Sequence, residues 1–346
     1  MRGKRFWPAA AALALAAPTA VPATAAVRGG DHYTWVALGD SYTAGLFTGR
    51  RDDHPDGCER TPGSYPDVVN RRLHAYPPEG LFVELRDVSC GNAAIPHLTR
   101  EPQTPIGRGA GVDDPAEPAG GWPQVPPQIE RAGIDDRTDV VTVGVGGNSL
   151  PFGELITRCL ALGAADGRGQ PCRDYYENPP AGVKSVADRL DRIEDDYVTM
   201  LGDVHRKAPN AKVITIGYPS LLPADPGECG YGDPTGTSTL ARADIPWLRE
   251  LEQRLNSTIR AVSGYFGDRF VDTDTASRGH DACRAAEVKW LEGFCGTAAP
   301  GNDWPAASCA GLAPGRRQTF FHPNEQGQRA IAELVEPAVR QALLDG

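Results

Sequence analysis

The stretch V-A-L-G-D-S-Y-T-A-G, residues 36–45, decides the fold of this chain, because an apolar run stops there at a Gly-Asp-Ser turn. Gly, Asp and Ser are common turn and N-cap residues, so the tripeptide is compatible with an ordinary connection between a strand and a helix. In a second interpretation, Ser41 is a nucleophile at the carboxyl edge of a sheet. The first turn of a helix would offer free N–H groups and a positive dipole end to a developing oxyanion there.

More short apolar runs rich in Val and Ile follow the first one, and helical patterns separate them. Continuous apolarity, in place of alternation, indicates strands that are covered on both faces of a parallel sheet. The predicted strands are residues 35–38, 83–88, 140–145, 213–216 and 270–271. This order predicts an α/β protein, a three-layer α/β/α sandwich with a central parallel sheet, whose active site lies at the carboxyl ends of the strands.

Apolar residues recur every three or four positions in residues 183–204 and 245–262, which predicts two amphipathic helices. A last helix is expected to begin near Asn324, and Pro337 should kink it or end its first half. Segments rich in Gly, Pro, Asp or Cys are interpreted as loops, at residues 101–121, 161–181 and 276–319.

The first 25 residues have the three parts of a secretory signal peptide. The basic start M-R-G-K-R is followed by an Ala- and Leu-rich segment at residues 8–18 and by the small residues A-T-A at positions 23–25. A membrane anchor is the alternative, but prolines interrupt the apolar segment. We therefore expect a secreted, extracellular protein, with a signal peptide at residues 1–25 and a single domain at residues 26–346.

Removal of this leader takes away Arg2, Lys4 and Arg5 and no acidic residue, so the formal net charge falls by three from -10 to -13. An acidic protein of this kind is repelled by nucleic acid and by anionic membranes. We expect no nucleic-acid partner, at most transient contact with a lipid surface, and a monomer.

Eight cysteines are spread over the chain, and none of them is part of the CxxC spacing that is typical of a zinc site. In an exported protein, an even number of cysteines indicates disulfides. Their connectivity does not follow from the sequence alone. Pairing each cysteine with its neighbour along the chain gives Cys58 with Cys90, Cys159 with Cys172, Cys229 with Cys283, and Cys295 with Cys309.

Three more motifs lie at predicted strand ends or at a predicted helix start. The segment S-C-G-N-A follows the second strand, and Gly91 in it lets a backbone N–H point into a site without a side chain in the way. The segment G-G-N-S follows the third strand, where the Asn148 amide can donate a hydrogen bond to an oxyanion. The segment F-F-H-P-N-E-Q-G holds His322 on a rigid loop before the last helix.

Each motif taken singly has a plainer interpretation. Gly91 fits an ordinary strand-end turn, and a lone histidine such as His322 is commonly structural. A dinucleotide-binding loop after the third strand is excluded, because Leu150 and its neighbours stand where a further glycine is required.

Together and in this order, the four segments closely resemble the GDSL-like SGNH hydrolase family over nearly the whole mature chain. The resemblance implies that Ser41 is the nucleophile and His322 the general base. It implies an oxyanion hole formed by the N–H groups of Ser41 and Gly91 and by the side-chain amide of Asn148. The cysteine-bearing loops are most similar to the branch of secreted bacterial lipases and esterases. Three disulfides are usual in that branch, and a fourth would be additional here.

Two residues depart from the family's pattern. Ser149 stands where the family often has Asp, which leaves the role of Asn148 unchanged. Thr319 stands where an Asp often orients the histidine, and some secreted members resemble this chain in using a backbone carbonyl instead. The resemblance therefore implies that the Thr319 carbonyl orients His322. The alternative is a carboxylate from elsewhere in the chain, at Asp272, Asp274, Asp281, Asp303 or Glu325.

The resemblance implies a carboxylic ester hydrolase that forms an acyl-enzyme on Ser41 and needs no cofactor and no metal. Its substrate is expected to be a small-molecule or lipid ester, and a glyceride, a phospholipid and an acetylated polysaccharide all remain open. A phospholipase A or lysophospholipase is one alternative. A catalytically inactive binding module of the same fold is another, but it would have little reason to keep a nucleophile, a base and an amide together.

Overall fold

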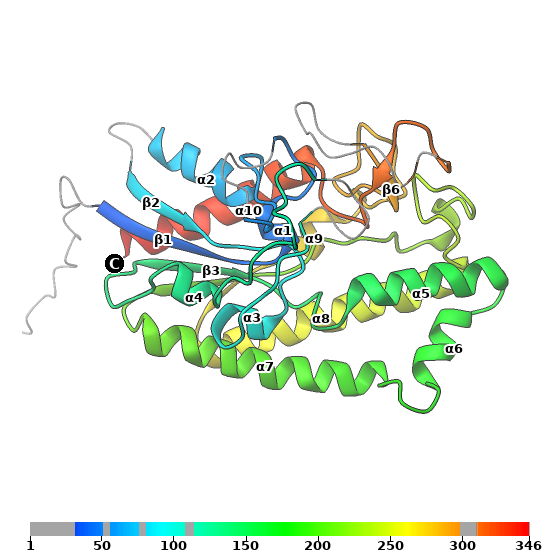
Figure 1. Ribbon diagram of the computed structural model, residues 1–346, viewed down its shortest axis with the longest axis horizontal. Helices are drawn as coiled ribbons and strands as arrows, with labels where there is room; N and C mark the ends of the chain where they lie inside the picture. The colour runs from blue at the N-terminus through cyan, green and yellow to red at the C-terminus, as the bar shows by residue number, and fades with distance from the viewer. Residues whose placement is uncertain are drawn as a thin grey trace, which may run out of the picture.

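Five parallel strands form the central sheet, in the order β2-β1-β3-β4-β5 (Figure 1). The computed structural model describes residues 32–50, 56–75, 81–107, 114–297, 309 and 311–345. The predicted signal peptide and Asp303 lie outside the described residues. The strands are β1 (His32–Gly39), β2 (Phe82–Asp87), β3 (Val140–Gly144), β4 (Lys212–Ile216) and β5 (Arg269–Val271). Each overlaps a predicted run, so the prediction of a parallel α/β sheet is confirmed.

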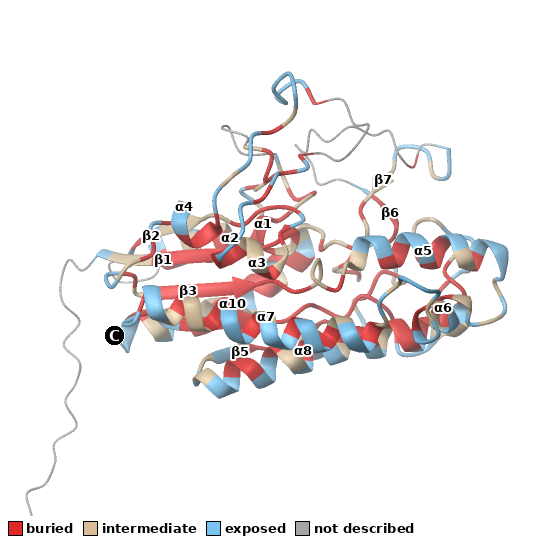
Figure 2. Cartoon of the chain, turned by 60° about the horizontal axis from the view of Figure 1, so that its bottom comes forward, coloured by how far each residue is buried: buried red, intermediate tan, exposed pale blue. Residues whose placement is uncertain are grey.

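Successive strand residues point into two separate cores, one on each face of the sheet. In β1, Trp35 belongs to one core, whereas Val36 and Leu38 belong to the other. Helices α2 (Tyr65–His74) and α10 (Glu325–Leu344) close the first core. The second is closed by α3 (Ile95–Thr99), α4 (Gln128–Arg131), α7 (Val186–Lys207) and α8 (Ile245–Phe266). The central strands β1, β3 and β4 are therefore buried on both faces over most of their length, which explains their continuous apolarity (Figure 2).

The three predicted helices correspond to α7, α8 and α10. Helix α10 begins after Asn324, whose side chain accepts the Gly327 N–H at 2.9 Å. The helix continues through Pro337 to Leu344. Val335 and Val339, on either side of the proline, are fully buried, and their packing holds both halves of the helix against the sheet.

The interpretation of residues 161–181 as a loop is wrong. Helix α5 (Phe152–Ala165) extends into this segment, and α6 (Pro171–Glu177) lies within it. The Cys159–Cys172 disulfide joins the two helices, and Cys172 and Tyr176 of α6 are buried. Tertiary packing and this bridge therefore override the loop-like composition of the segment.

Short elements make up most of the remaining regular structure. They are α1 (Ser41–Ala44), α9 (Thr273–Ser277), the 3-10 turns η1 (Pro226–Glu228) and η2 (Arg242–Asp244), and the antiparallel strands β6 (Cys295–Gly296) and β7 (Arg317–Gln318). The described parts of residues 101–121 and 276–319 are otherwise irregular, as predicted.

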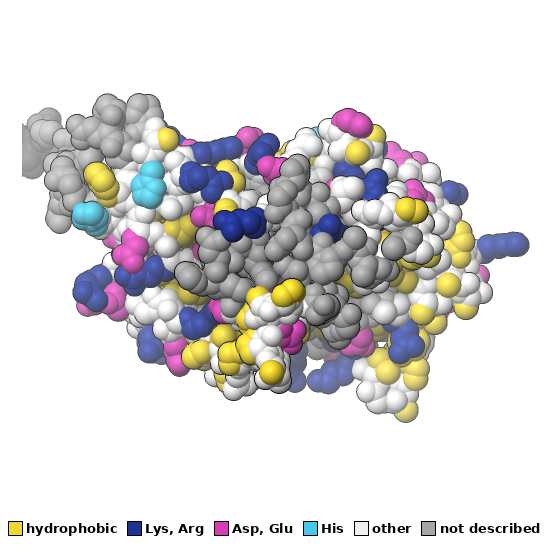
Figure 3. Space-filling model, turned by 45° about the horizontal axis from the view of Figure 1, so that its top comes forward, with side chains coloured by type: hydrophobic (Ala, Val, Ile, Leu, Met, Phe, Trp, Pro, Cys, Tyr) yellow, Lys and Arg dark blue, Asp and Glu magenta, His cyan; other side chains and the backbone are white. Residues whose placement is uncertain are grey.

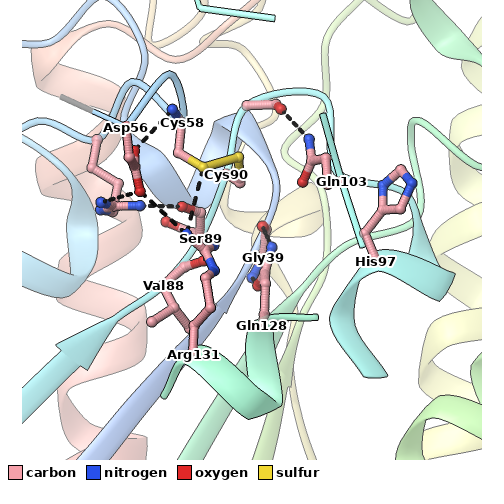
Figure 4. Close-up of a disulfide and its surroundings, with 12 residues drawn as sticks. Gly39, Asp56, Cys58, Val88, Ser89, Cys90, His97, Gln103, Gln128 and Arg131 are labelled. Carbon is pink, nitrogen blue, oxygen red and sulfur yellow. Dashed lines mark hydrogen bonds and ion pairs between the residues drawn. A yellow bond between two sulfur atoms is a disulfide. The ribbon is translucent and has the colours of Figure 1, made fainter. Parts of the chain in front are cut away.

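Four disulfides link the eight cysteines, and each joins neighbours along the chain. They are Cys58–Cys90, Cys159–Cys172, Cys229–Cys283 and Cys295–Cys309. Cys58–Cys90 lies beside the carboxyl end of β2 (Figure 4). Next to it, Arg131 donates to the Val88 carbonyl and pairs with Asp56 at 3.2 Å. The bridge therefore fixes a loop at the same sheet edge as the Gly-Asp-Ser turn.

We expect thiol titration of the unfolded, unreduced mature protein to find no free cysteine, because all eight are paired. Reduction should lower the free energy of unfolding by about 2 to 4 kcal/mol for each bridge. Two or more free thiols in the native protein would contradict the four-bridge arrangement.

Among the described residues, no helix combines the length and apolarity that crossing a membrane requires.

Lys and Arg side chains are interspersed with Asp and Glu side chains on the face shown in Figure 3. Within the part of the chain that the structure describes, no group of His, Cys, Asp and Glu side chains is arranged to hold a metal ion.

Candidate active site

The Gly-Asp-Ser turn joins β1 to α1 at the carboxyl end of the sheet. Gly39 is required by close packing, because a Cβ there would lie 2.7 Å from the Gly144 carbonyl oxygen of β3. The Gln128 side chain holds both main-chain groups of Gly39 at 2.8 Å (Figure 4). Asp40 caps α1 by accepting the Tyr42 N–H at 3.0 Å. Ser41 thus becomes the first residue of the helix, and its own N–H has no acceptor among the described residues.

His322 lies against Ser41 although 281 positions separate them in the chain. Its Nε2 is 2.7 Å from Ser41 Oγ, and its Nδ1 is 2.7 Å from the Thr319 carbonyl oxygen. A carbonyl can only accept, so this contact selects the tautomer with the proton on Nδ1. Nε2 is then free to accept a hydrogen bond from the Ser41 hydroxyl.

The His322 ring is packed between aromatic side chains. Its centroid lies 4.8 Å from that of Tyr42 and 5.4 Å from that of Phe47. Loss of water around the ring lowers the pKa of His322 from 6.5 to about 4, and the Thr319 carbonyl opposes this shift. The imidazole is therefore neutral near pH 7, which is the state that accepts a proton.

None of the described carboxylates considered as hidden partners contacts His322. Each of them is paired with an arginine, namely Asp272 with Arg260, Asp274 with Arg278, Asp281 with Arg284, and Glu325 with Arg329. Asp303 is outside the described residues. Where the structure describes the chain, the Thr319 carbonyl is thus the oxygen that holds Nδ1.

The prediction that the Gly91 N–H faces the site is wrong, because this group donates to the Cys58 carbonyl at 2.9 Å. The next residue, Asn92, has a φ of 63°, and its N–H has no acceptor in the part of the chain that the structure describes. Both residues line the cavity at Ser41. Asn tolerates this left-handed conformation better than most residues, which is the sequence signal that could have favoured Asn92.

Asn148 follows β3 and also faces the cavity. Its Nδ2 donates to the Ala93 carbonyl at 3.0 Å, so this contact joins the second and third motifs. A side-chain amide carries two N–H protons, and the second remains for another acceptor. Ser149, the departure from the family's pattern, accepts the Ile95 N–H at 3.0 Å.

Asp40 and Tyr218 form a buried pair that the sequence motifs did not indicate. The Tyr218 hydroxyl donates to Asp40 Oδ2 and accepts the Gly147 N–H at 2.8 Å. Burial raises the pKa of Asp40 to about 7, and the hydrogen bonds from Tyr218 and Tyr42 oppose that shift. Tyr218 follows a strand, like many core tyrosines, so its sequence context carries no signal of this contact.

A cavity of about 970 Å³ begins at Ser41 and His322 and continues between α5 and α8. Its wall is mainly apolar, and α8 contributes Leu248, Leu251 and Leu255. The charged side chains at the wall are Asp40, Glu154, Arg158, Glu252 and Arg317. The site thus combines a hydroxyl, a neutral imidazole, two backbone N–H groups that have no acceptor among the described residues, and space for an apolar group. This set of groups suits acyl transfer.

Comparison with known proteins agrees with this chemistry. The model of the GDSL-like Lipase/Acylhydrolase family matches residues 37–330. The chain is 31% identical over 303 residues to "Lipase 2" of Streptomyces coelicolor, covering 86% of this chain and 83% of that protein. It is 28% identical over 370 residues to an "Esterase" of Streptomyces scabiei, covering 98% and 95% of the two chains.

Solved structures show the same fold. Phospholipase A1 from Streptomyces albidoflavus superposes with a TM-score of 0.55 at 19% identity, over 90% of this chain and all of that chain. An extracellular lipase from Streptomyces rimosus gives 0.51 at 21% identity, over 90% of this chain and 99% of that chain. With the family match over most of its length, this chain belongs to the GDSL-like lipase/acylhydrolase family and is a carboxylic ester hydrolase.

Proposed function

We propose that the protein is a secreted serine esterase or lipase in which Ser41 is the nucleophile and His322 the general base. The observation that carries this proposal is the 2.7 Å contact between Ser41 Oγ and His322 Nε2, with Nδ1 held by the Thr319 carbonyl. The lowered pKa of His322 supports it, because a neutral imidazole is ready to accept a proton at pH 7.

The reaction has two halves. Ser41 Oγ bonds to the ester carbonyl carbon while its proton moves to His322 Nε2, and the carbonyl electron pair moves onto oxygen. When that pair returns, the bond to the alcohol breaks, and the alcohol leaves with the proton from His322. Water then attacks the acyl group on Ser41 by the same route, which releases the acid and restores both residues.

We assign the oxyanion hole to the N–H groups of Ser41 and Asn92 and to the Asn148 side-chain amide. Support comes from their place around the cavity and from the lack of an acceptor for the two backbone N–H groups among the described residues. Asn92 takes the place of Gly91 in this assignment, since the Gly91 N–H donates its hydrogen bond to the Cys58 carbonyl oxygen. Charge that develops on the carbonyl oxygen would be stabilised by all three donors.

The substrate we propose is an ester with an apolar acyl chain, because the wall of the cavity beside Ser41 is mainly apolar and includes Leu248, Leu251 and Leu255 of α8. A phospholipase A or lysophospholipase is the second candidate. The observation in its favour is that Arg158 and Arg317 line the same cavity, where a cationic side chain can pair with a phosphate group.

Secretion, a single domain over residues 26–346 and a monomeric state belong to the same proposal. Four disulfides support secretion, because such bonds persist in oxidising compartments. The expected signal peptide at residues 1–25 would direct the export.

A fluorophosphonate and a series of esters together test the proposed function. The reagent should add covalently to the peptide that contains Ser41, and it should stop hydrolysis of p-nitrophenyl esters in proportion to labelling. Turnover should be compared from acetate to palmitate and then on phosphatidylcholine and lysophosphatidylcholine. Labelling of a different residue would overturn the nucleophile, and a preference for acetate over all longer chains would overturn the acyl-chain substrate.

The pH dependence should follow His322. Because the pKa of its imidazole is lowered to about 4 and the neutral form is the active one, kcat/KM should fall to half near pH 4 and remain high at pH 6. An unshifted histidine would give this fall near 6.5. Asp40, whose pKa is near 7, is the control, and any step near neutrality should disappear in Asp40→Asn. A fall near pH 6.5 that persists in Asp40→Asn would contradict a histidine base with a lowered pKa.

A further inference from the structure

Tyr218 joins two parts of the proposed site through one oxygen atom. It lies two residues beyond the end of β4, at the same carboxyl edge as Ser41 and Asn148. Its hydroxyl donates to the Asp40 side chain and accepts the Gly147 N–H at 2.8 Å. Asp40 directly precedes Ser41, and Gly147 directly precedes Asn148. The hydroxyl therefore bridges the nucleophile turn and the loop that carries the side-chain amide.

The surroundings of Tyr218 hold it in a fixed position. Asn256 of α8 accepts the Tyr218 N–H at 2.8 Å and donates to the Tyr218 carbonyl at 2.9 Å. The Tyr218 ring meets the Tyr42 ring edge-on, with 5.2 Å between centroids. A Cβ at Gly147 would lie 3.4 Å from the Tyr218 ring, so ring and loop are already in close contact. Both Tyr218 and Asn256 are buried.

The Tyr218 hydroxyl adds an anchor to the loop after β3, which Asn148 and Ser149 also join to the segment after β2. Gly146 and Gly147 have no side chains, and glycine leaves the backbone more conformations than other residues do. A donor in an oxyanion hole must lie about 3 Å from the oxygen that develops charge. A displacement of about 1 Å in a reacting geometry can lower the rate by a factor of about 100.

We propose that Tyr218 is a positioning residue whose hydroxyl holds the Asn148 loop at a fixed distance from the Ser41 turn. It touches no reacting atom, and its effect on the rate passes mainly through the position of Asn148. The proposal rests on the oxyanion role of Asn148 given above.

Tyr218→Phe tests this link with the smallest possible change. We expect kcat to fall by about 10- to 100-fold, with KM changing by less than about twofold, because the loss concerns transition-state binding. Tyr197→Phe is the matched control. Tyr197 is a buried tyrosine too, and its hydroxyl has no hydrogen-bond partner among the described residues. This control should keep the kcat of the unmodified enzyme.

A double-mutant cycle shows whether the effect passes through Asn148. In an Asn148→Ala background the amide is already absent, so adding Tyr218→Phe should cost less than about threefold in kcat. A Tyr218→Phe enzyme with more than half of the normal kcat would overturn the proposal. An equal loss from Tyr218→Phe in both backgrounds would also overturn it.

A structure of the unmodified enzyme with a phosphonate bound to Ser41 provides a measurement that does not depend on folding of a variant. The Tyr218 hydroxyl should remain bonded to Asp40 and Gly147, while Asn148 Nδ2 donates to the phosphonate oxygen. Separation of Tyr218 from Gly147 in that adduct would overturn the positioning role. If Asn148→Ala itself leaves kcat unchanged, the oxyanion assignment fails and the positioning role fails with it. Loss in Asn148→Ala without loss in Tyr218→Phe overturns the positioning role alone.

Discussion

Replacing Ser41 with alanine is expected to abolish ester hydrolysis while leaving the fold intact. Ser41 Oγ forms the acyl bond in the proposed reaction. Among the described residues, no other hydroxyl contacts His322 Nε2. Nucleophile and base act as one unit, so His322→Ala should cause a loss of the same order, about 10⁶-fold in kcat, and the double variant should be no worse.

The measurement is turnover of p-nitrophenyl esters by enzymes whose disulfides and thermal unfolding match those of the unmodified protein. Ser149→Ala is a suitable control, because the Ser149 hydroxyl accepts the Ile95 N–H and makes no recorded contact with His322. The kcat of this variant should stay within the same order of magnitude as that of the unmodified enzyme. If Ser41→Ala retains more than about a hundredth of normal turnover, the nucleophile has been assigned to the wrong residue.

Replacing Asn148 with alanine should lower kcat by about 100- to 1000-fold with a much smaller change in KM. The amide is needed chiefly when charge has developed on the substrate oxygen, so its loss affects the transition state more than the bound substrate. The lost Nδ2 contact with Ala93 should also leave the turn after β2 less well held.

Asn92→Gly is the matched control for this prediction. It removes a second side-chain amide that lines the cavity but keeps the backbone N–H, and glycine adopts the φ of 63° without strain. We expect kcat within about threefold of that of the unmodified enzyme, because the backbone N–H can still donate to the oxyanion when the side chain is removed. An Asn148→Ala enzyme with a raised KM and a normal kcat would show that the amide binds substrate and does not stabilise an oxyanion.

Much of the fold could be predicted from the sequence, because burial on both faces makes the central strands continuously apolar. The runs around Val36, Val141 and Val213 marked three of the parallel strands directly. Helices α7 and α8 show the helical period because one side of each is buried. Helix α6 was missed, because the Cys159–Cys172 bridge and tertiary packing stabilise it more than its local composition does.

The four motifs, through their resemblance to the family, predicted that Ser41, Asn148 and His322 meet at one site, and the structure brings these residues to one cavity at the carboxyl edge of the sheet. Ser41, Asn148 and His322 are each fixed by a strand end or a helix start that can be recognised locally. Only the tertiary structure decided between the Gly91 and Asn92 N–H groups. The Gly91 N–H is not available to a substrate, because it donates to the carbonyl of Cys58, which lies 33 positions away in the chain. It likewise decided the Tyr218 bridge between Asp40 and Gly147. Hydrogen bonds between distant segments depend on atomic positions that local sequence patterns do not encode.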